Sequence, residues 1–294
     1  IFLVLIEYEP KVFPLSDANR PKANSIRTLT VAANTGEMVK PAELIEVRGA
    51  AKLTLADRRL FNVLLRHAFG PELGSENRRF EIPLSDLRET HDSNDRLVRS
   101  IEALMTTVVT IQRSDGSTDR VQLLGWNNLS DPKRSRGSLK YAIPPELAVM
   151  LRDSTVFAKL ELEVLRSFTS KYALALYETI ARRARLRYIC TERFSLGDFR
   201  EVLGVEAGKL TTFGNLNQYA IKRALLEVNA LSDFTVTILP EKTGRRVTGV
   251  LVDWETKDVE ARKAAYAELQ RSRVGRRARI TGTVENMCSS DLID

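Results

Sequence analysis

One order of secondary-structure elements occurs twice along the 294-residue chain, and this repetition limits the possible folds more than any other feature. Residues 54–69, 80–87 and 93–106 predict a helix, a short strand leading into a helical turn, and a second helix, followed by alternating residues over 107–126. The same order returns in 169–186, 193–204, 215–231 and 234–255. The apolar period changes from 3.6 to 2 residues at the same point of both copies, which indicates a tandem duplication.

This order is that of a winged helix, in which a helix-turn-helix core is followed by a hairpin called the wing. The first hairpin, 107–126, is expected to turn at Asp115-Gly116 and the second at Thr243-Gly244. Thr54 precedes the first helix as a plausible N-cap, and Ser93 or Asn94 caps the helix over 93–106. The sequence therefore predicts an α+β fold made of tandem winged-helix domains related by a pseudo-two-fold duplication.

Four regions follow from this duplication. We expect a loosely ordered N-terminal arm at 1–41, with a short strand at 43–49, a first winged-helix domain at 42–155 and a second at 156–256. A basic C-terminal tail covers 257–294. Residues 260–273 of the tail predict a helix, either a DNA-touching or partner-binding extension or a charged helix that frays. The chain from Cys288 onward resembles the translation of a common sequencing adapter, so we interpret it as not native.

Charge and cysteine content narrow the function classes. Lys and Arg number 45 against 38 Asp and Glu, a net charge of +7, which fits a polyanionic partner but also a soluble protein with a basic surface. Cys190 and Cys288 form no disulfide framework and have no metal-site spacing, so a reducing, cytoplasmic setting is expected. The opening "IFLVLI" is far shorter than the roughly 20 apolar residues that cross a bilayer. We therefore expect no metal, no cofactor and no membrane partner.

The stretch "GVEAGKLT", 204–211, contains the glycines, lysine and threonine of a phosphate-binding loop but not their spacing. Such a loop needs four residues between its glycines and a Ser or Thr directly after the Lys. Here three residues separate Gly204 from Gly208, and Leu210 follows Lys209. Gly204 is instead predicted to end a helix in the left-handed conformation. The two histidines, His67 and His91, lie too far apart for a His-hydrophobic-His metal site. The sequence also has no HExxH or GxSxG motif and no clustered acidic trio, so no enzymatic activity is expected.

Five stretches in the right order resemble a known family: "LTLADRRLFNVLLRHA", "SKYALALYETIARR", "LGV", "LLEVN" and "FTVTILPEKTGRRVTGVLVDW". They are similar to the plasmid replication initiator proteins with two winged helices, which bind repeated origin sites called iterons. The resemblance covers about 42–256. It implies a protein that binds double-stranded DNA, at origin iterons as a monomer and at operator repeats as a dimer. It also implies that the protein represses its own gene and melts an AT-rich segment with the host initiator and helicase.

Two other functions stay open at this point. The same architecture serves transcriptional regulators that have no origin role, and winged helices also act as protein-interaction modules. Iterons in the DNA that flanks the gene would separate the initiator from the regulator. DNA binding that weakens steeply with salt would separate both from an interaction module.

If the helical turn is counted as the second helix, the third helix of each domain covers 93–106 or 215–231. Base contacts are expected from the outward face of this recognition helix, since the major groove admits one α-helix. The alternative is that these faces are merely solvated. In this family the second recognition helix commonly begins with several Lys or Arg, whereas this chain has Asn217, Gln218 and Tyr219. The family's residue-level contacts therefore transfer poorly, although Asn and Gln can pair with adenine edges. The candidates in the second domain are Asn215, Gln218, Tyr219, Lys222 and Arg223, and those in the first are Arg96, Arg99 and Ser100.

Phosphate contacts are expected from basic residues near these helices, because each neutralised phosphate releases counterions. For Arg182 and Arg185 the alternative is that they only interact favourably with the helix dipole. For the loop residues Lys133, Arg134 and Arg136 the alternative is that they are only solvated. The candidates are Lys209 before the second recognition helix; Lys242, Arg245 and Arg246 in the second wing; Arg182 and Arg185 at a helix end; and Lys133, Arg134 and Arg136 in a loop.

Overall fold

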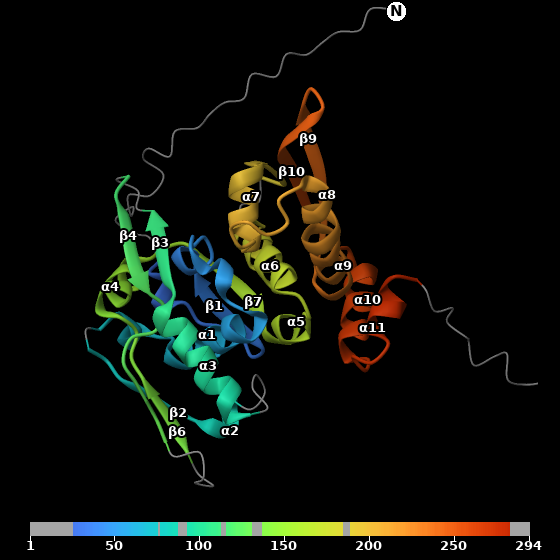
Figure 1. The fold of residues 1–294 in the computed structure, drawn as a ribbon. Coiled ribbons are helices and arrows are strands. Elements are labelled where there is room, and N and C mark those ends of the chain that lie inside the picture. The colour runs from blue at the N-terminus through green and yellow to red at the C-terminus, as the bar shows by residue number, and fades with distance from the viewer. Residues whose placement is uncertain are drawn as a thin grey trace, which may run out of the picture.

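The computed structural model describes residues 26–75, 77–87, 93–112, 116–130, 137–184 and 189–282. Two winged helices and a helical C-terminal module make up this part of the chain (Figure 1). In the view of Figure 1, the hairpin β9–β10 of the second winged helix extends toward the top and the β2–β6 strands of the first toward the bottom. The predicted α+β class and the tandem winged helices are confirmed.

The first winged helix begins with a helix whose capping the sequence predicts. Thr54 caps α1 through a capping box, in which the Asp57 N–H donates to Thr54 Oγ1 at 3.3 Å and the Thr54 N–H donates to Asp57 Oδ2 at 2.7 Å. Ser93 caps α3 by accepting from the Arg96 N–H. The elements are α1 (Leu55–Ala68), β2 (Phe80–Pro83), α2 (Leu84–Leu87), α3 (Asn94–Thr106), β5 (Asn127–Leu129) and β6 (Ser138–Tyr141).

The second winged helix repeats this order, and every element after its first helix is longer than its counterpart in the first copy. Its third helix is continuous from Phe213 to Leu231 and contains a π-helical turn at Asn217–Ile221. Gly204 ends α7 with φ +67°, the left-handed conformation that the sequence predicts. The elements are α6 (Lys171–Arg183), β8 (Thr191–Ser195), α7 (Leu196–Leu203), α8 (Phe213–Leu216), α9 (Lys222–Leu231), β9 (Phe234–Thr243) and β10 (Arg246–Thr256).

Sheet topology corrects the predicted wing of the first copy. The second sheet has the order β8-β10-β9, so the strand after the first helix pairs with the last strand of the wing. The corresponding sheet of the first copy is β2-β6-β5, which makes β5–β6 its wing. The predicted hairpin over 107–126 does form, as β3 (Val108–Gln112) and β4 (Thr118–Gln122), but these strands make a separate two-stranded sheet. They are an insertion between α3 and the wing.

The segment before α1 is more ordered than predicted. β1 (Glu37–Pro41) pairs antiparallel with β7 (Phe157–Glu161), so part of the predicted arm is a strand. The strand predicted at 43–49 is wrong, because the chain turns there and only Arg48 makes a bridge, to Thr110. The remaining elements are three short 3-10 helices before α1 (Thr28–Thr30, Ala42–Leu44, Ala50–Lys52), a fourth after it (Pro71–Gly74), α4 (Pro145–Asp153) and α5 (Leu162–Ser167).

A buried polar cluster lies between the two winged helices. Lys40 of β1 donates from Nζ to Glu178 Oε1 of α6 at 2.8 Å and to Asn62 Oδ1 of α1 at 2.9 Å. Asn62 Nδ2 also donates to Glu178 Oε1, at 2.9 Å. Burial lowers the pKa of Lys40, and the adjacent Glu178 carboxylate opposes this shift. Around the cluster, buried apolar side chains from both winged helices form one continuous core.

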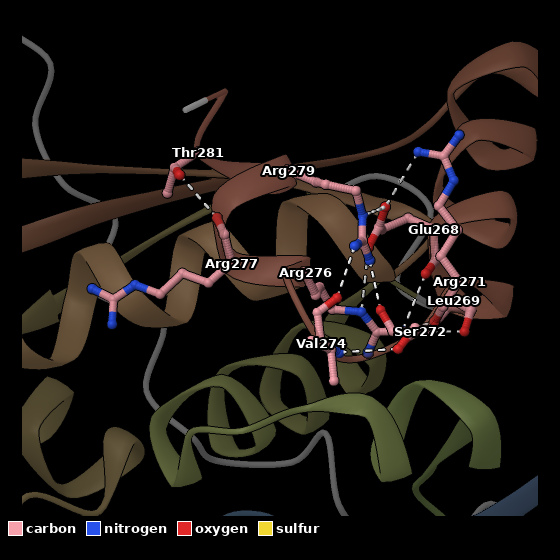
Figure 2. A network of polar contacts seen from close by, with 9 residues as sticks. All are labelled: Glu268, Leu269, Arg271, Ser272, Val274, Arg276, Arg277, Arg279 and Thr281. Atoms are coloured by element: carbon pink, nitrogen blue, oxygen red, sulfur yellow. Dashed lines mark hydrogen bonds and ion pairs between the residues drawn. The ribbon is translucent and has the colours of Figure 1, made fainter. Parts of the chain in front are cut away.

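The C-terminal tail is folded into a small module through residue 282. α10 (Val259–Gln270) and α11 (Arg276–Ile280) pack against α9, and Ala265 and Leu269 are buried. Figure 2 shows Glu268 at the centre of the module, where Arg279 Nη2 donates to Glu268 Oε1 at 2.7 Å. Hydrogen bonding from Arg279 lowers the pKa of Glu268. The predicted tail helix forms as α10, and this network of ion pairs holds it to α11. Cys288 lies outside the described residues.

Candidate nucleic-acid interface

The second recognition helix separates an apolar face from a polar one. Thr212 caps it by accepting from the Asn215 N–H at 3.2 Å. Its buried side chains are Leu216, Ala220, Ile221, Ala224, Val228 and Leu231. By its spacing Leu225 also belongs to this face, where it packs against the core but is only half-buried. This apolar face fixes the helix on α6, leaving its other side exposed.

All five base-contact candidates of this helix lie on the exposed side. Asn215 belongs to the first turn, Gln218 and Tyr219 to the π-helical turn, and Lys222 and Arg223 to the turn after it. The Arg223 guanidinium lies 5.7 Å from the ring centre of Tyr219, whose side chain is 45% exposed. Amide, phenol, ammonium and guanidinium groups therefore share one helix face, which is the chemistry that donates to and accepts from base edges.

The second wing adds positive charge beside this helix. Thr243 pairs with Arg246, so the two-residue turn is Gly244-Arg245, with Gly244 at φ +62°. Lys242, Arg245 and Arg246 are exposed around this turn, and Arg193 of β8 pairs with Glu241 at 2.7 Å just before it. Lys209 is exposed in the connection between α7 and α8. In the chain, Lys209 precedes the recognition helix and the wing residues follow it, and all of them are exposed and free to contact phosphates.

The first recognition helix presents fewer candidates. Arg96 and Arg99 of α3 are exposed. Ser100 is 4% exposed and donates from Oγ to Asp57 Oδ1 of α1 at 2.6 Å. The prediction that Ser100 faces outward is wrong, because this hydrogen bond satisfies Asp57 inside the packing of α1 on α3. Ser100 is therefore part of the interior.

The remaining arginine and lysine candidates divide into two groups. Arg182 pairs with Glu46, and its side chain is 23% exposed, so its charge is already neutralised at the contact between α6 and the segment before α1. Arg185 lies outside the described residues, as do Lys133, Arg134 and Arg136. In sequence, the last three lie between β5 and β6, the two strands of the first wing.

One contact between exposed side chains was not predicted from the sequence. The guanidinium of Arg79 lies 4.3 Å from the ring centre of Trp126, which is 43% exposed. The two residues directly precede β2 and β5, and these strands flank β6 on opposite sides. No local pattern links residues so distant in the chain, so only strand pairing reveals the contact.

Two further findings bear on the kind of site. Among the described residues, no group of three or more His, Cys, Asp or Glu side chains is placed to hold a metal ion. Within the same residues, every helix is too short or too polar to cross a membrane. The arrangement that does exist is a pair of recognition helices with basic residues around the second.

Comparisons with known proteins agree with this architecture. The model of the first winged helix (WH1) of the initiator replication proteins matches residues 37–181, and the model of their second (WH2) matches residues 195–254. A crystal structure described as the Pi initiator protein in complex with iteron DNA is similar in fold, with a TM-score of 0.56 at 16% identity. The similarity covers 78% of this chain and 100% of that one. No curated protein matches the sequence. Because the two models together span most of the chain in the order of its two winged helices, the protein belongs to the family of initiator replication proteins.

Proposed function

We propose that this protein initiates plasmid replication by binding iterons in double-stranded DNA, with the second winged helix as the main source of base contacts. The observation that carries this proposal is the exposed face formed by Asn215, Gln218, Tyr219, Lys222 and Arg223, opposite a fully apolar face. The family assignment favours an initiator over a transcriptional regulator of the same architecture. The iteron complex of the similar Pi initiator supports the choice of DNA.

The proposal assigns different tasks to the regions of the chain. The first winged helix, within 42–155, contributes to dimerisation and to DNA contact, and the second, within 156–256, contributes most base contacts. Lys209 and the wing residues Lys242, Arg245 and Arg246 neutralise phosphates. In the bacterial cytoplasm the protein opens the origin together with a host initiator and helicase, and as a dimer it represses its own gene. Catalysis has no part in this function.

Selection of bound duplexes tests the proposal. The purified chain is incubated with a random-sequence duplex pool, and retained DNA is sequenced over several rounds. We expect one motif to be enriched and to occur as tandem repeats beside the gene that encodes the protein. A pool that stays random after selection would overturn the proposal. Enrichment of a motif that does not recur at the origin would instead favour the transcriptional regulator.

A wing variant tests the phosphate contacts separately. Replacing Lys242 and Arg245 with Ala is expected to lower affinity for all duplexes and to reduce the slope of log affinity against log salt by about 0.9 per lost phosphate contact. Lys263→Ala is the control, because Lys263 is exposed on α10, away from the wing, and pairs with Glu260 at 2.8 Å. Equal slopes for the wing variant and the wild type would place the wing away from DNA.

A further inference from the structure

The turn that precedes the second recognition helix contains a residue in an unfavourable conformation. Leu210 has φ +48°, and among the described residues Asn77 is the other non-glycine residue with positive φ. The left-handed conformation is energetically unfavourable for a leucine, because its Cβ is crowded by the backbone. The Leu210 side chain nevertheless packs against the core. Such a conformation persists only where surrounding contacts restrain the backbone.

Arg200 supplies that restraint from the preceding helix. Its Nη1 donates to the Leu210 carbonyl at 2.7 Å, and its Nη2 donates to the Lys209 carbonyl. One guanidinium thus bridges α7 to two successive carbonyls at the end of the turn. A planar fork of donors suits this task, whereas the ammonium of a lysine acts as a single point. Both bonds end on backbone atoms, so they fix the path of the chain.

The far side of the same turn is also held. The Lys209 N–H donates to the Glu206 carbonyl at 3.0 Å, which closes a tight turn through Gly208 at φ +77°. Lys171 of α6 pairs with the Glu206 carboxylate at 3.7 Å and donates to the Ala51 carbonyl at 2.7 Å. The turn is therefore anchored at its beginning by Lys171 and at its end by Arg200. Thr212, the N-cap of the recognition helix, lies two residues after Leu210.

We propose that Arg200 is a positioning residue for DNA recognition, which holds Leu210 in the left-handed conformation and so sets where the recognition helix begins. This inference rests on the proposed function. Arg200 acts through the backbone and not through a DNA phosphate. Its loss lets Leu210 relax toward an ordinary conformation, which displaces Thr212 and the helix turn that carries Asn215. Base contacts need close geometry, whereas phosphate attraction tolerates displacement, so specific binding suffers more than non-specific binding.

The test measures two quantities for each variant: the ratio of specific to non-specific affinity, and the salt slope of binding. The specific probe is the duplex that the wild-type chain enriches from the random pool, and the non-specific probe is a mixed-sequence duplex of equal length. Arg200→Ala is expected to lower the ratio by about tenfold, which corresponds to about 1.4 kcal/mol, and to leave the salt slope unchanged. Arg200→Lys is expected to give an intermediate ratio.

Lys209→Ala is the matched control, because Lys209 is an exposed basic residue of the same turn. It is expected to lower the slope by about 0.9 with little effect on the ratio. A slope that falls equally in Arg200→Ala would show that Arg200 contacts a phosphate and would overturn the inference. An unchanged ratio in Arg200→Ala would do the same. If the wild-type chain enriches no duplex, the proposed function fails instead, so the two failures are distinct.

A double-mutant cycle identifies the route of the effect. Leu210→Gly removes the Cβ that opposes the left-handed conformation. If Arg200 acts through Leu210, the effects of Arg200→Ala and Leu210→Gly on the affinity ratio are less than additive. Additive effects would show that the two residues act independently, which contradicts the inference. Thermal melts of each variant check that the second winged helix stays folded, and Arg200→Lys replaces Arg200→Ala if the latter does not fold.

Discussion

The two winged helices have the same sheet order but present different surfaces. In the second, strands of ten and eleven residues form a wing that closes in a two-residue turn. In the first, the wing strands have three and four residues, and the hairpin β3–β4 is inserted before them. The third helix of the second copy exposes five polar candidates, whereas that of the first exposes Arg96 and Arg99 and buries Ser100.

This difference shows that two copies of one architecture can share a core while their surfaces differ. The apolar faces stay alike because both copies need a core, and the buried residues of both form one cluster. The exposed faces are free to diverge, since surface substitutions cost little stability. The second copy has the longer wing, and the first contains the inserted hairpin β3–β4.

The largest expected effect concerns the junction between the copies. Lys40→Met leaves Glu178 buried without its charged partner, which is expected to destabilise the protein by about 3 to 5 kcal/mol in a denaturant titration. Lys159→Met is the matched control on the strand paired with β1, because its ion pair with Glu37 is partly exposed and has a distance of 3.7 Å. That variant should lose at most about 1 kcal/mol. Equal losses would mean that burial of the Lys40 pair is unimportant.

Core substitutions test whether the copies unfold together. Leu104→Ala in α3 and Leu216→Ala in α8 each remove a fully buried side chain, so each is expected to cost about 2 to 5 kcal/mol. Because the core is continuous, we expect a single transition for both variants. The measurement follows the fluorescence of the buried Trp254 in a Trp126→Phe background alongside far-UV circular dichroism. Two separated transitions would show that the copies are independent folding units.

Paired charge removals compare the copies as DNA readers. Replacing Lys222 and Arg223 together with Ala is expected to weaken specific binding by about 1 to 3 kcal/mol per lost base contact in a gel-shift titration. Replacing Arg96 and Arg99 together removes the same charge from α3 and is expected to have a smaller effect. Each double variant removes two positive charges, so their non-specific electrostatic losses are matched. The difference between their losses of specific affinity therefore measures the base contacts. A larger loss from the α3 variant would reverse the assigned roles.

The smallest expected effect is the contribution of His67, in the first copy, to the pH dependence of stability. Both histidines, His67 and His91, precede the second winged helix, and His91 lies outside the described residues. Burial lowers the pKa of His67 below its ordinary value of 6.5, and its Nδ1 lies 3.0 Å from the Tyr141 hydroxyl. Between the lowered pKa and 6.5, the unfolded chain binds a proton that the folded chain does not. Stability should therefore fall slightly as pH drops through this window.

Nuclear magnetic resonance titration of the histidine ring signals measures this pKa directly. Denaturant titrations from pH 7 to pH 5 measure the change in stability, and His67→Asn should flatten it. The effect is small because the His67 ring is only partly desolvated. A pKa at or above 6.5 would contradict the expectation.

Much of the fold could be predicted because helix faces and turns leave local patterns. The apolar stripe of Ala220, Ala224 and Val228 is buried as its spacing predicts, and Gly204 ends α7 in the left-handed conformation. The wing of the first copy could not be found this way. Strands β3–β4 and β5–β6 both lie between α3 and α4 in the chain, and only pairing with β2 distinguishes the wing from the insertion.

The candidate site shows the same limit. Ser100 is as polar as its exposed neighbours, and only the packing of α3 on α1 brings it to Asp57. Arg182 is as basic as its neighbours at the helix end, and only the fold places Glu46 beside it. Nothing in the sequence around Arg200 predicts its hydrogen bonds to the Lys209 and Leu210 carbonyls. Each of these roles depends on a partner that no local pattern specifies.

The sequence by itself determined that the chain contains two winged helices, which helix faces are apolar, and which residues stand outside on the second recognition helix. These properties depend on residues within a few positions of one another, so periodicity and turn chemistry specify them. Tertiary structure alone decided which hairpin is the first wing, which basic side chains are already paired, and how β1 joins the two copies through Lys40 and Glu178. Those outcomes depend on contacts between distant segments, which exist only once the whole core has formed.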